Sequence, residues 1–306
     1  MRRKIIKQGI GGNTIFLPVK WVRENNLAPG QEVDIVELDE GLLISASGGK
    51  EQKKEIETSI ADDHEPFIRQ ILDTLYRVGY DKITIQYQNK TQEKIIETLV
   101  DSTMLGFEVT KKKDHEIVIE GITELTSEKQ HSLLRKMLLI IKESFGMLES
   151  DIKNSSYGNL EEIKTLSRRF SKYDNFCTRN ISKKKFSEPK ATSHWTLYSY
   201  LRLTQRSLLH LYEVLEKNRD LTLNPSIQNL IYQLQKCFEG IYEGYFKKDL
   251  SILNKNNVAA NKLLYNTVHT QLKKSSGIES VVLYYCGEIA RLVCITTVPM
   301  LGIIIE

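Results

Sequence analysis

The feature that most constrains the fold of this 306-residue sequence is a run of long segments with helical periodicity, which extends from about residue 126 to the end. Apolar residues recur there every three to four positions, as on the buried face of a helix, and short polar breaks separate the segments. The predicted helices are 127–150, 159–181, 193–218, 225–246, 249–273 and 277–298. Ser127 and Gln130 have the spacing of a capping box at the first helix start, and Pro225 suits another. Because the connections are short, we expect an all-α domain over 125–306, built as a pair of three-helix bundles.

The last of these helices is apolar enough to be compared with a membrane span. Glu288 and Arg291 interrupt the apolar segment, and the 292–305 remainder is shorter than the roughly 20 residues that a spanning helix needs. We therefore expect a buried bundle helix and no membrane span. The residues that follow Met1 have no apolar leader pattern, and the four cysteines form no C-x-x-C pair. These features predict a cytoplasmic protein with reduced thiols.

A small α+β module is predicted over 62–124. A helix with Pro66 in its first turn ends at Gly79, and 82–88 alternates as a strand. A second helix over 91–103 is followed by a hairpin, 106–111 and 115–120. The polar segment 48–61 in front of this module predicts a linker.

Residues 1–47 predict a β-α-β-β unit. Its strands are 3–8, 13–17, 33–38 and 42–45, and a short helix spans 19–26. A unit of about 45 residues usually cannot bury enough surface to be stable alone, and its short strands leave open edges. We therefore expect two copies to interlock into one barrel, each chain supplying half, so that the protein is a homodimer. The fold class is multidomain α+β.

Charge is segregated within this unit. Residues 1–23 hold six basic residues and no acidic one, whereas 24–44 hold six acidic residues and no basic one. The basic residues are Arg2, Arg3, Lys4, Lys7, Lys20 and Arg23. In a dimer they predict a positive surface for DNA phosphates, with Arg2 and Arg3 able to reach base edges. The alternative is a solvated basic face on a module that only dimerises. Trp21 is assigned to the core rather than to base stacking.

A second basic group lies on one predicted helix and the loop after it. Its members are Lys164, Arg168, Arg169, Lys172, Arg179, Lys183, Lys184 and Lys185, of which Arg168, Arg169, Lys172, Lys183, Lys184 and Lys185 form the predicted patch. This group either extends the DNA surface or meets an acidic partner, or it is a solvated helix face beside a loop.

Nothing in the sequence indicates catalysis. The six histidines are scattered, and no G-x-S-x-G, Walker loop or H-E-x-x-H is present. We expect no enzyme activity and no cofactor.

Three short motifs support a family resemblance for the first unit. Lys4-Ile-Ile-Lys-Gln-Gly, Ile15-Phe-Leu-Pro-Val-Lys-Trp-Val-Arg and Leu27-Ala-Pro-Gly-Gln-Glu-Val resemble the AbrB/MazE/SpoVT swapped-hairpin DNA-binding domain. The remainder resembles PhoU-like phosphate-uptake regulators, in the archaeal arrangement that places an AbrB-type domain first. The residues that carry this second resemblance are Gly79-Tyr80, Leu105-Gly-Phe-Glu-Val and Ser171-Lys-Tyr-Asp-Asn-Phe-Cys-Thr-Arg-Asn, together with the six-helix pattern.

The resemblance implies a cytoplasmic, dimeric regulator that binds DNA and controls phosphate uptake or related genes. PhoU proteins commonly hold metal clusters on E/D-x-x-x-D motifs, but Phe170 stands four residues before Asp174 here. The pairs Glu97–Asp101 and Glu216–Asp220 have that spacing in isolation, so we predict no metal site.

Two functions stay open at this point. The first is a DNA-binding transcriptional regulator. The second is a protein-interaction regulator, in which the first unit only dimerises and the helices dock on a phosphate transporter or a signalling protein. A MazE-type antitoxin is less favoured, because such proteins tend to carry a short disordered tail after the module.

Overall fold

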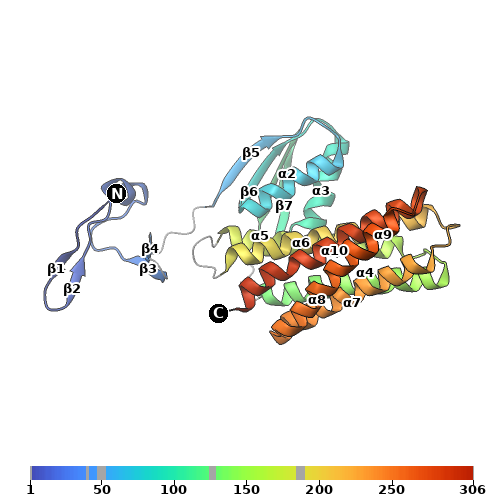
Figure 1. Ribbon diagram of the computed structural model, residues 1–306. Coiled ribbons are helices and arrows are strands. Elements are labelled where there is room, and N and C mark those ends of the chain that lie inside the picture. Colours follow the sequence, from blue (N-terminus) through green and yellow to red (C-terminus); the bar gives the residue numbers. More distant parts are fainter. Residues whose placement is uncertain (1, 39–40, 47–52, 124–128, 184–189, 306) are drawn as a thin grey trace. The chain divides into compact units, whose positions relative to one another are not determined.

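A computed structural model describes residues 2–38, 41–46, 53–123, 129–183 and 190–305, and the chain forms two compact units, 1–53 and 54–306 (Figure 1). The predicted turn at Asp39, the capping residue Ser127, residues 48–52 of the predicted linker, Lys184 and Lys185 lie outside the described residues.

The first unit consists of two separate hairpins and a short helix. Strand β1 (Ile6–Gln8) pairs antiparallel with β2 (Gly12–Thr14), and Gly11 takes a left-handed φ of 96° in the turn between them. Helix α1 (Val19–Glu24) follows, and then β3 (Val33–Leu38) pairs antiparallel with β4 (Gly41–Ala46). Within one chain, the described strands of this unit form no closed barrel.

The first unit has no hydrophobic core of its own. None of its described side chains between residues 2 and 46 is buried. Ile5, Phe16 and Ile35 are 72%, 64% and 58% exposed, and Leu42 is 64% exposed. The pairing of Ile35 with Ile44 and of Glu37 with Leu42 places Ile35, Leu42 and Ile44 on the same face of the β3–β4 hairpin. An apolar sheet face is therefore left open in the single chain.

The second unit begins with a four-stranded sheet in the order β5-β6-β8-β7. Strand β5 (Glu55–Ser59) is parallel to β6 (Lys82–Gln86), whereas β8 (Glu116–Gly121) is antiparallel to β6 and to the edge strand β7 (Phe107–Lys113). The linker prediction over 48–61 is wrong for β5. Only Ile56 and Thr58 of this strand are half-buried, and its other residues are exposed. Because so little of the strand is apolar, its sequence resembles that of a polar linker.

Two helices cover the inner face of this sheet. Ile83 and Ile85 of β6 share a hydrophobic cluster with Leu72 of α2 (Glu65–Val78) and Ile96 of α3 (Lys90–Thr103). Both helices also contact α5 of the helical region, so they lie between the sheet and the bundle. The mixed α+β class with a helical C-terminal region is confirmed.

The helical region follows the predicted boundaries closely. Its helices are α4 (Lys129–Asn154), α5 (Leu160–Lys183), α6 (Ala191–Lys217), α7 (Pro225–Lys247), α8 (Leu250–Lys262), α9 (His269–Leu272) and α10 (Gly277–Ile304), with a π-helical turn, Leu263–Val268, between α8 and α9. Helices α4, α5 and α6 contact one another, and so do α7, α8 and α10. Contacts of α6 with α10 and of α4 with α7 join the two sets over one continuous core. Figure 1 shows α10, in red, alongside α6.

Helix α10 is long and apolar enough, by length and composition, to cross a bilayer, and 44% of its most apolar stretch is buried. It continues beyond Pro299 to Ile304, whereas the prediction ended it at 298. Cys286, Ile289 and Val293 of α10 lie in the core that the bundle helices share.

Candidate functional site

The six predicted DNA-contacting residues all lie in the first unit. Arg2, Arg3 and Lys4 precede β1, and Lys7 is on β1. Lys20 and Arg23 are on α1, where Lys20 Nζ lies 3.7 Å from Glu24 Oε1. All six side chains are exposed, so each is accessible to a polyanion. Their gathering on one surface of a dimer stays a prediction.

The second predicted basic group divides in the structure. Lys172 Nζ donates to the Asp101 carbonyl oxygen at 2.6 Å, and Lys183 Nζ donates to Asp81 Oδ1 at 2.9 Å. These two lysines therefore hold α5 to the α+β layer. Arg168 and Arg169 are exposed. A role for the group in binding DNA or a partner stays a prediction.

One polar face of α5 forms the junction between the bundle and the α+β layer. Lys172, Asn175, Arg179 and Lys183 recur at helical spacing, and each donates a hydrogen bond to α2, α3 or the residues that follow them. This spacing is visible in the sequence, but a polar helix face is equally consistent with exposure to solvent.

Arg179 is the most buried cation of this junction, with its side chain 8% exposed. Nη1 donates to the carbonyl oxygens of Tyr76 and Tyr80 at 2.9 and 2.7 Å, and Nη2 donates to Asp81 Oδ1. The guanidinium also lies 4.8 Å from the ring centroid of Phe107. Arg179 thus ties α5 to the C-terminal end of α2 and to the hydrophobic cluster of the α+β layer.

Asp81 joins this junction to the start of the second unit. Its Oδ2 accepts from the backbone N–H of Lys54 at 3.1 Å, just ahead of β5. Burial by itself raises the pKa of the Asp81 carboxyl, but the hydrogen bonds from Lys183 and Lys54 and the charges of Lys183 and Arg179 outweigh it and lower the pKa. Asp81 is therefore held as a carboxylate between α5 and the first residue of the second unit.

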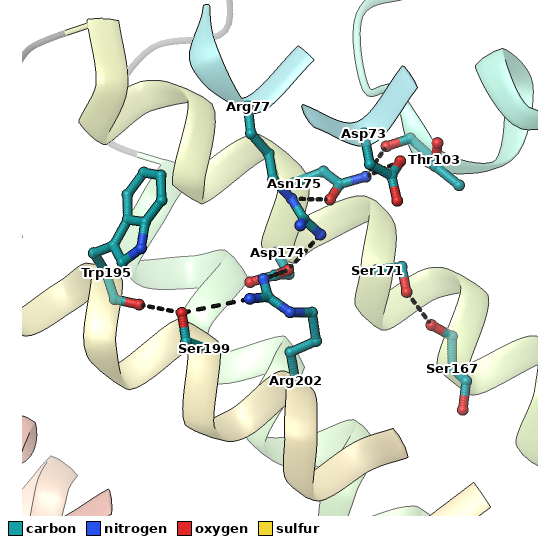
Figure 2. Close-up of polar contacts among 10 residues, drawn as sticks. All are labelled: Asp73, Arg77, Thr103, Ser167, Ser171, Asp174, Asn175, Trp195, Ser199 and Arg202. Atoms are coloured by element: carbon teal, nitrogen blue, oxygen red, sulfur yellow. Dashed lines mark hydrogen bonds and ion pairs between the residues drawn. The ribbon is translucent and has the colours of Figure 1, made fainter. Parts of the chain in front are cut away.

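A second ionic cluster surrounds Asp174, which precedes Arg179 on α5. Figure 2 shows this cluster. Asp174 is fully buried, and its Oδ2 accepts from Arg202 Nη1 of α6 at 2.6 Å and from Arg77 Nη2 of α2 at 3.2 Å. Burial raises the pKa of the Asp174 carboxyl, and the charges of Arg202 and Arg77 oppose that rise. One carboxylate therefore joins three helices.

Asn175 completes the connection. Its Oδ1 accepts from Arg77 Nε at 2.6 Å, and its Nδ2 donates to Asp73 Oδ1 at 2.8 Å and to the Thr103 carbonyl oxygen at 3.0 Å (Figure 2). The segment around Asp174 carries part of the family resemblance, but its partners Asp73, Arg77 and Arg202 were not predicted, because charges so far apart in the chain carry no shared local signal.

In each of the two carboxylate pairs with metal-motif spacing, one member has a cationic partner. Glu97 forms an ion pair with Lys112, and Glu216 forms one with Arg219. Across the described residues there is no group of three or more His, Cys, Asp or Glu side chains placed to hold a metal ion. What the junction offers is a set of polar contacts, buried around Asp174 and Arg179 and partly exposed at Asp81, that couples α2 and the start of β5 to the bundle.

Comparisons with protein-family models, curated proteins and solved structures gave no match to this chain. The family resemblance therefore rests on the sequence motifs and the six-helix pattern.

Proposed function

We propose that this protein is a dimeric DNA-binding transcriptional regulator, whose first unit contacts DNA and whose second unit senses a signal. The observation that carries the proposal is the combination, in the first unit, of an open apolar sheet face with six exposed basic side chains. None of the side chains that the structure describes between residues 2 and 46 is buried, which favours pairing with a second chain, and the charge favours a polyanionic partner.

Dimerisation supplies the free energy that a single copy lacks. Burying an exposed Leu, Ile or Phe side chain contributes about 1.5–3 kcal/mol. Ile35 and Leu42 lie on one open face, and Ile5 and Phe16 add to the exposed apolar surface. A second copy with the same face is the simplest complement, because a two-fold interface pairs a surface with itself.

DNA binding follows from the charge that the dimer carries. Each phosphate contact adds about −0.9 to the slope of log affinity against log salt concentration. Each chain carries six exposed cations, and if even half of them contact phosphates, the affinity for DNA falls steeply as the ionic strength rises.

We assign the helical region to the PhoU-like class, in which it would form a pair of three-helix bundles. The two sets of mutually contacting helices, α4–α6 and α7–α8–α10, support it. The link to phosphate uptake rests on the resemblance of the sequence. The Asp81 junction supports a sensing role, because it connects α5 of the bundle with Lys54, the first residue after the DNA-binding unit.

Fluorescence anisotropy of a short mixed-sequence DNA duplex, titrated with the full chain from about 50 to about 200 mM salt, tests the proposal. We expect affinity to fall steeply across this range, and the triple variant Arg2→Ala/Arg3→Ala/Lys4→Ala to bind more weakly with a shallower slope. The matched control removes three exposed lysines from the bundle, Lys136, Lys247 and Lys273, and retains wild-type binding.

Two results would overturn the proposal. One is a complex whose affinity ignores salt or survives the triple substitution. The other is a chain that dimerises but does not bind DNA at low salt, which would favour the protein-interaction regulator.

A further inference from the structure

We propose that a hollow between α2, α3 and α5 binds a phosphorylated small molecule about as large as a nucleotide. The hollow has a volume of about 690 Å³ and lies wholly within the second unit. Ligand sites for small molecules range from about 300 to about 1,000 Å³. An inorganic phosphate ion would occupy only a small part of this space, so the volume favours a larger ligand.

The charge of the lining selects for an anion. Arg69 of α2, Lys90 and Lys94 of α3 and Arg168 of α5 contribute four cations, whereas Glu65 is the single acid of the lining. Glu65 is already engaged by Arg69 Nη2 at 2.6 Å, and Lys90 Nζ lies 2.8 Å from Glu93.

Two of the four cations form no ion pair within the described part of the chain and can therefore bind an anionic ligand. Among the residues that the structure describes, Lys94 and Arg168 have no carboxylate within ion-pair distance. Arg168 Nη2 donates to the hydroxyl of Thr165, and its remaining donors can meet a phosphate in the bidentate geometry that guanidinium groups favour. Lys94 and Arg168 come from α3 and α5, so a phosphate held by both would bridge the α+β layer and the bundle.

The other lining residues fit the uncharged part of such a ligand. Half-buried Ile95 provides apolar surface in the lining, whereas Leu99, also in the lining, is 1% exposed. Thr98 Oγ1 donates to the Lys94 carbonyl oxygen, and Ser102 Oγ donates to the Thr98 carbonyl oxygen. Because both hydroxyls already donate, their lone pairs are left to accept hydrogen bonds, as from a sugar hydroxyl or an exocyclic amine. A nucleoside phosphate offers an anion, such donors and a flat apolar face together.

This inference is independent of DNA binding by the first unit, and isothermal titration calorimetry on the full chain tests it. The probes are ATP, AMP, glucose 6-phosphate, adenosine and inorganic phosphate. We expect ATP or AMP to bind, and adenosine and inorganic phosphate to bind at least tenfold more weakly, because each fills only part of the site. If glucose 6-phosphate binds more tightly than either nucleotide, the ligand is still a phosphorylated small molecule, but the preference for a nucleoside is refuted.

Variants separate this hollow from other basic surfaces. Lys94→Ala/Arg168→Ala is expected to weaken nucleotide binding by tenfold or more, since each substitution removes a charged hydrogen-bond donor to the phosphate. Arg169→Ala, which removes the neighbouring exposed arginine of α5 outside the lining, is the matched control and leaves binding unchanged. Arg2→Ala/Arg3→Ala/Lys4→Ala also leaves it unchanged if the first unit is not the site.

The proposal is overturned if no probe binds, if the double variant binds like the wild type, or if Arg169→Ala costs as much as the double variant. Because the altered side chains are exposed, the fold of each variant is expected to persist, and a thermal melt of each one checks this. Loss of nucleotide binding in the first-unit variant alone would place the site on the DNA-binding surface and also contradict the inference.

Discussion

Arg179→Ala is expected to loosen the attachment of the α+β layer to the bundle more than any exposed substitution on the same helix. The side chain is 8% exposed and donates three hydrogen bonds, to Tyr76, Tyr80 and Asp81. Truncating one member of a buried charged pair costs about 3–5 kcal/mol. Because Lys183 still contacts Asp81 and Tyr76 O still accepts from the Gly79 N–H, we expect the lower part of this range, about 3 kcal/mol.

Thermal unfolding followed by circular dichroism measures this effect. At about 2–4 °C per kcal/mol for a domain of this size, the melting temperature of the Arg179→Ala variant is expected to fall by about 10 °C. Arg179→Lys keeps the charge, but a single ammonium cannot reach two carbonyls and a carboxylate as the planar guanidinium does, so it recovers only part of the loss. Arg169→Ala is the matched control and shifts stability by no more than about 0.5 kcal/mol. A melting temperature of Arg179→Ala equal to that of the control would refute the reasoning.

Two further predictions follow from the pKa shifts. The pKa of Asp81 is lowered in the folded protein, so the carboxylate stabilises the fold above the ordinary pKa near 3.8, and this stability is lost as the pH falls through the lowered pKa. The free energies of urea unfolding of the wild type and of Asp81→Asn should therefore differ at neutral pH and converge in acid. A difference that stays the same at all pH values would contradict this. Burial raises the pKa of the Cys237 and Cys286 thiols to about 11 and about 12, whereas Cys294 is half-buried. A thiol reagent at about pH 8 should therefore label Cys294 well before the other two cysteines in the folded protein. Mass spectrometry of the digested protein measures the labelling, and equal labelling of all three would count against this prediction.

The sequence predicted the helical region well, because long periodic stretches leave few alternatives. Pro225 starts α7 as expected, and the other predicted boundaries lie within a few residues of the observed ones, apart from the end of α10. Strand β5 was missed because an edge strand with one polar face buries little, so its pairing with β6 decides its structure rather than its own composition.

The site was predictable only in part. The charge segregation of the first unit is visible in the order of its residues, whereas its pairing with a second copy stays a prediction from its small size. The junction was not predictable, because Asp174 meets Arg77 and Arg202 only after α2, α5 and α6 have come together. Lys172 and Lys183 illustrate the same limit: a helical face of lysines is solvated or bonded depending on what lies opposite.

Pairing of the first unit with a second copy underlies both the proposed stability of this unit and its DNA-binding surface, and sedimentation equilibrium of the full chain measures it directly. We predict a mass of twice 35.3 kDa for the wild type and of a single chain for Ile35→Asp, which places a charge on the open face of β3–β4. Asp34→Ala, on the opposite face of the same strand, is the control and stays dimeric. A wild-type mass of one chain, or an Ile35→Asp variant that still sediments as a dimer, would contradict pairing through the open face of β3–β4.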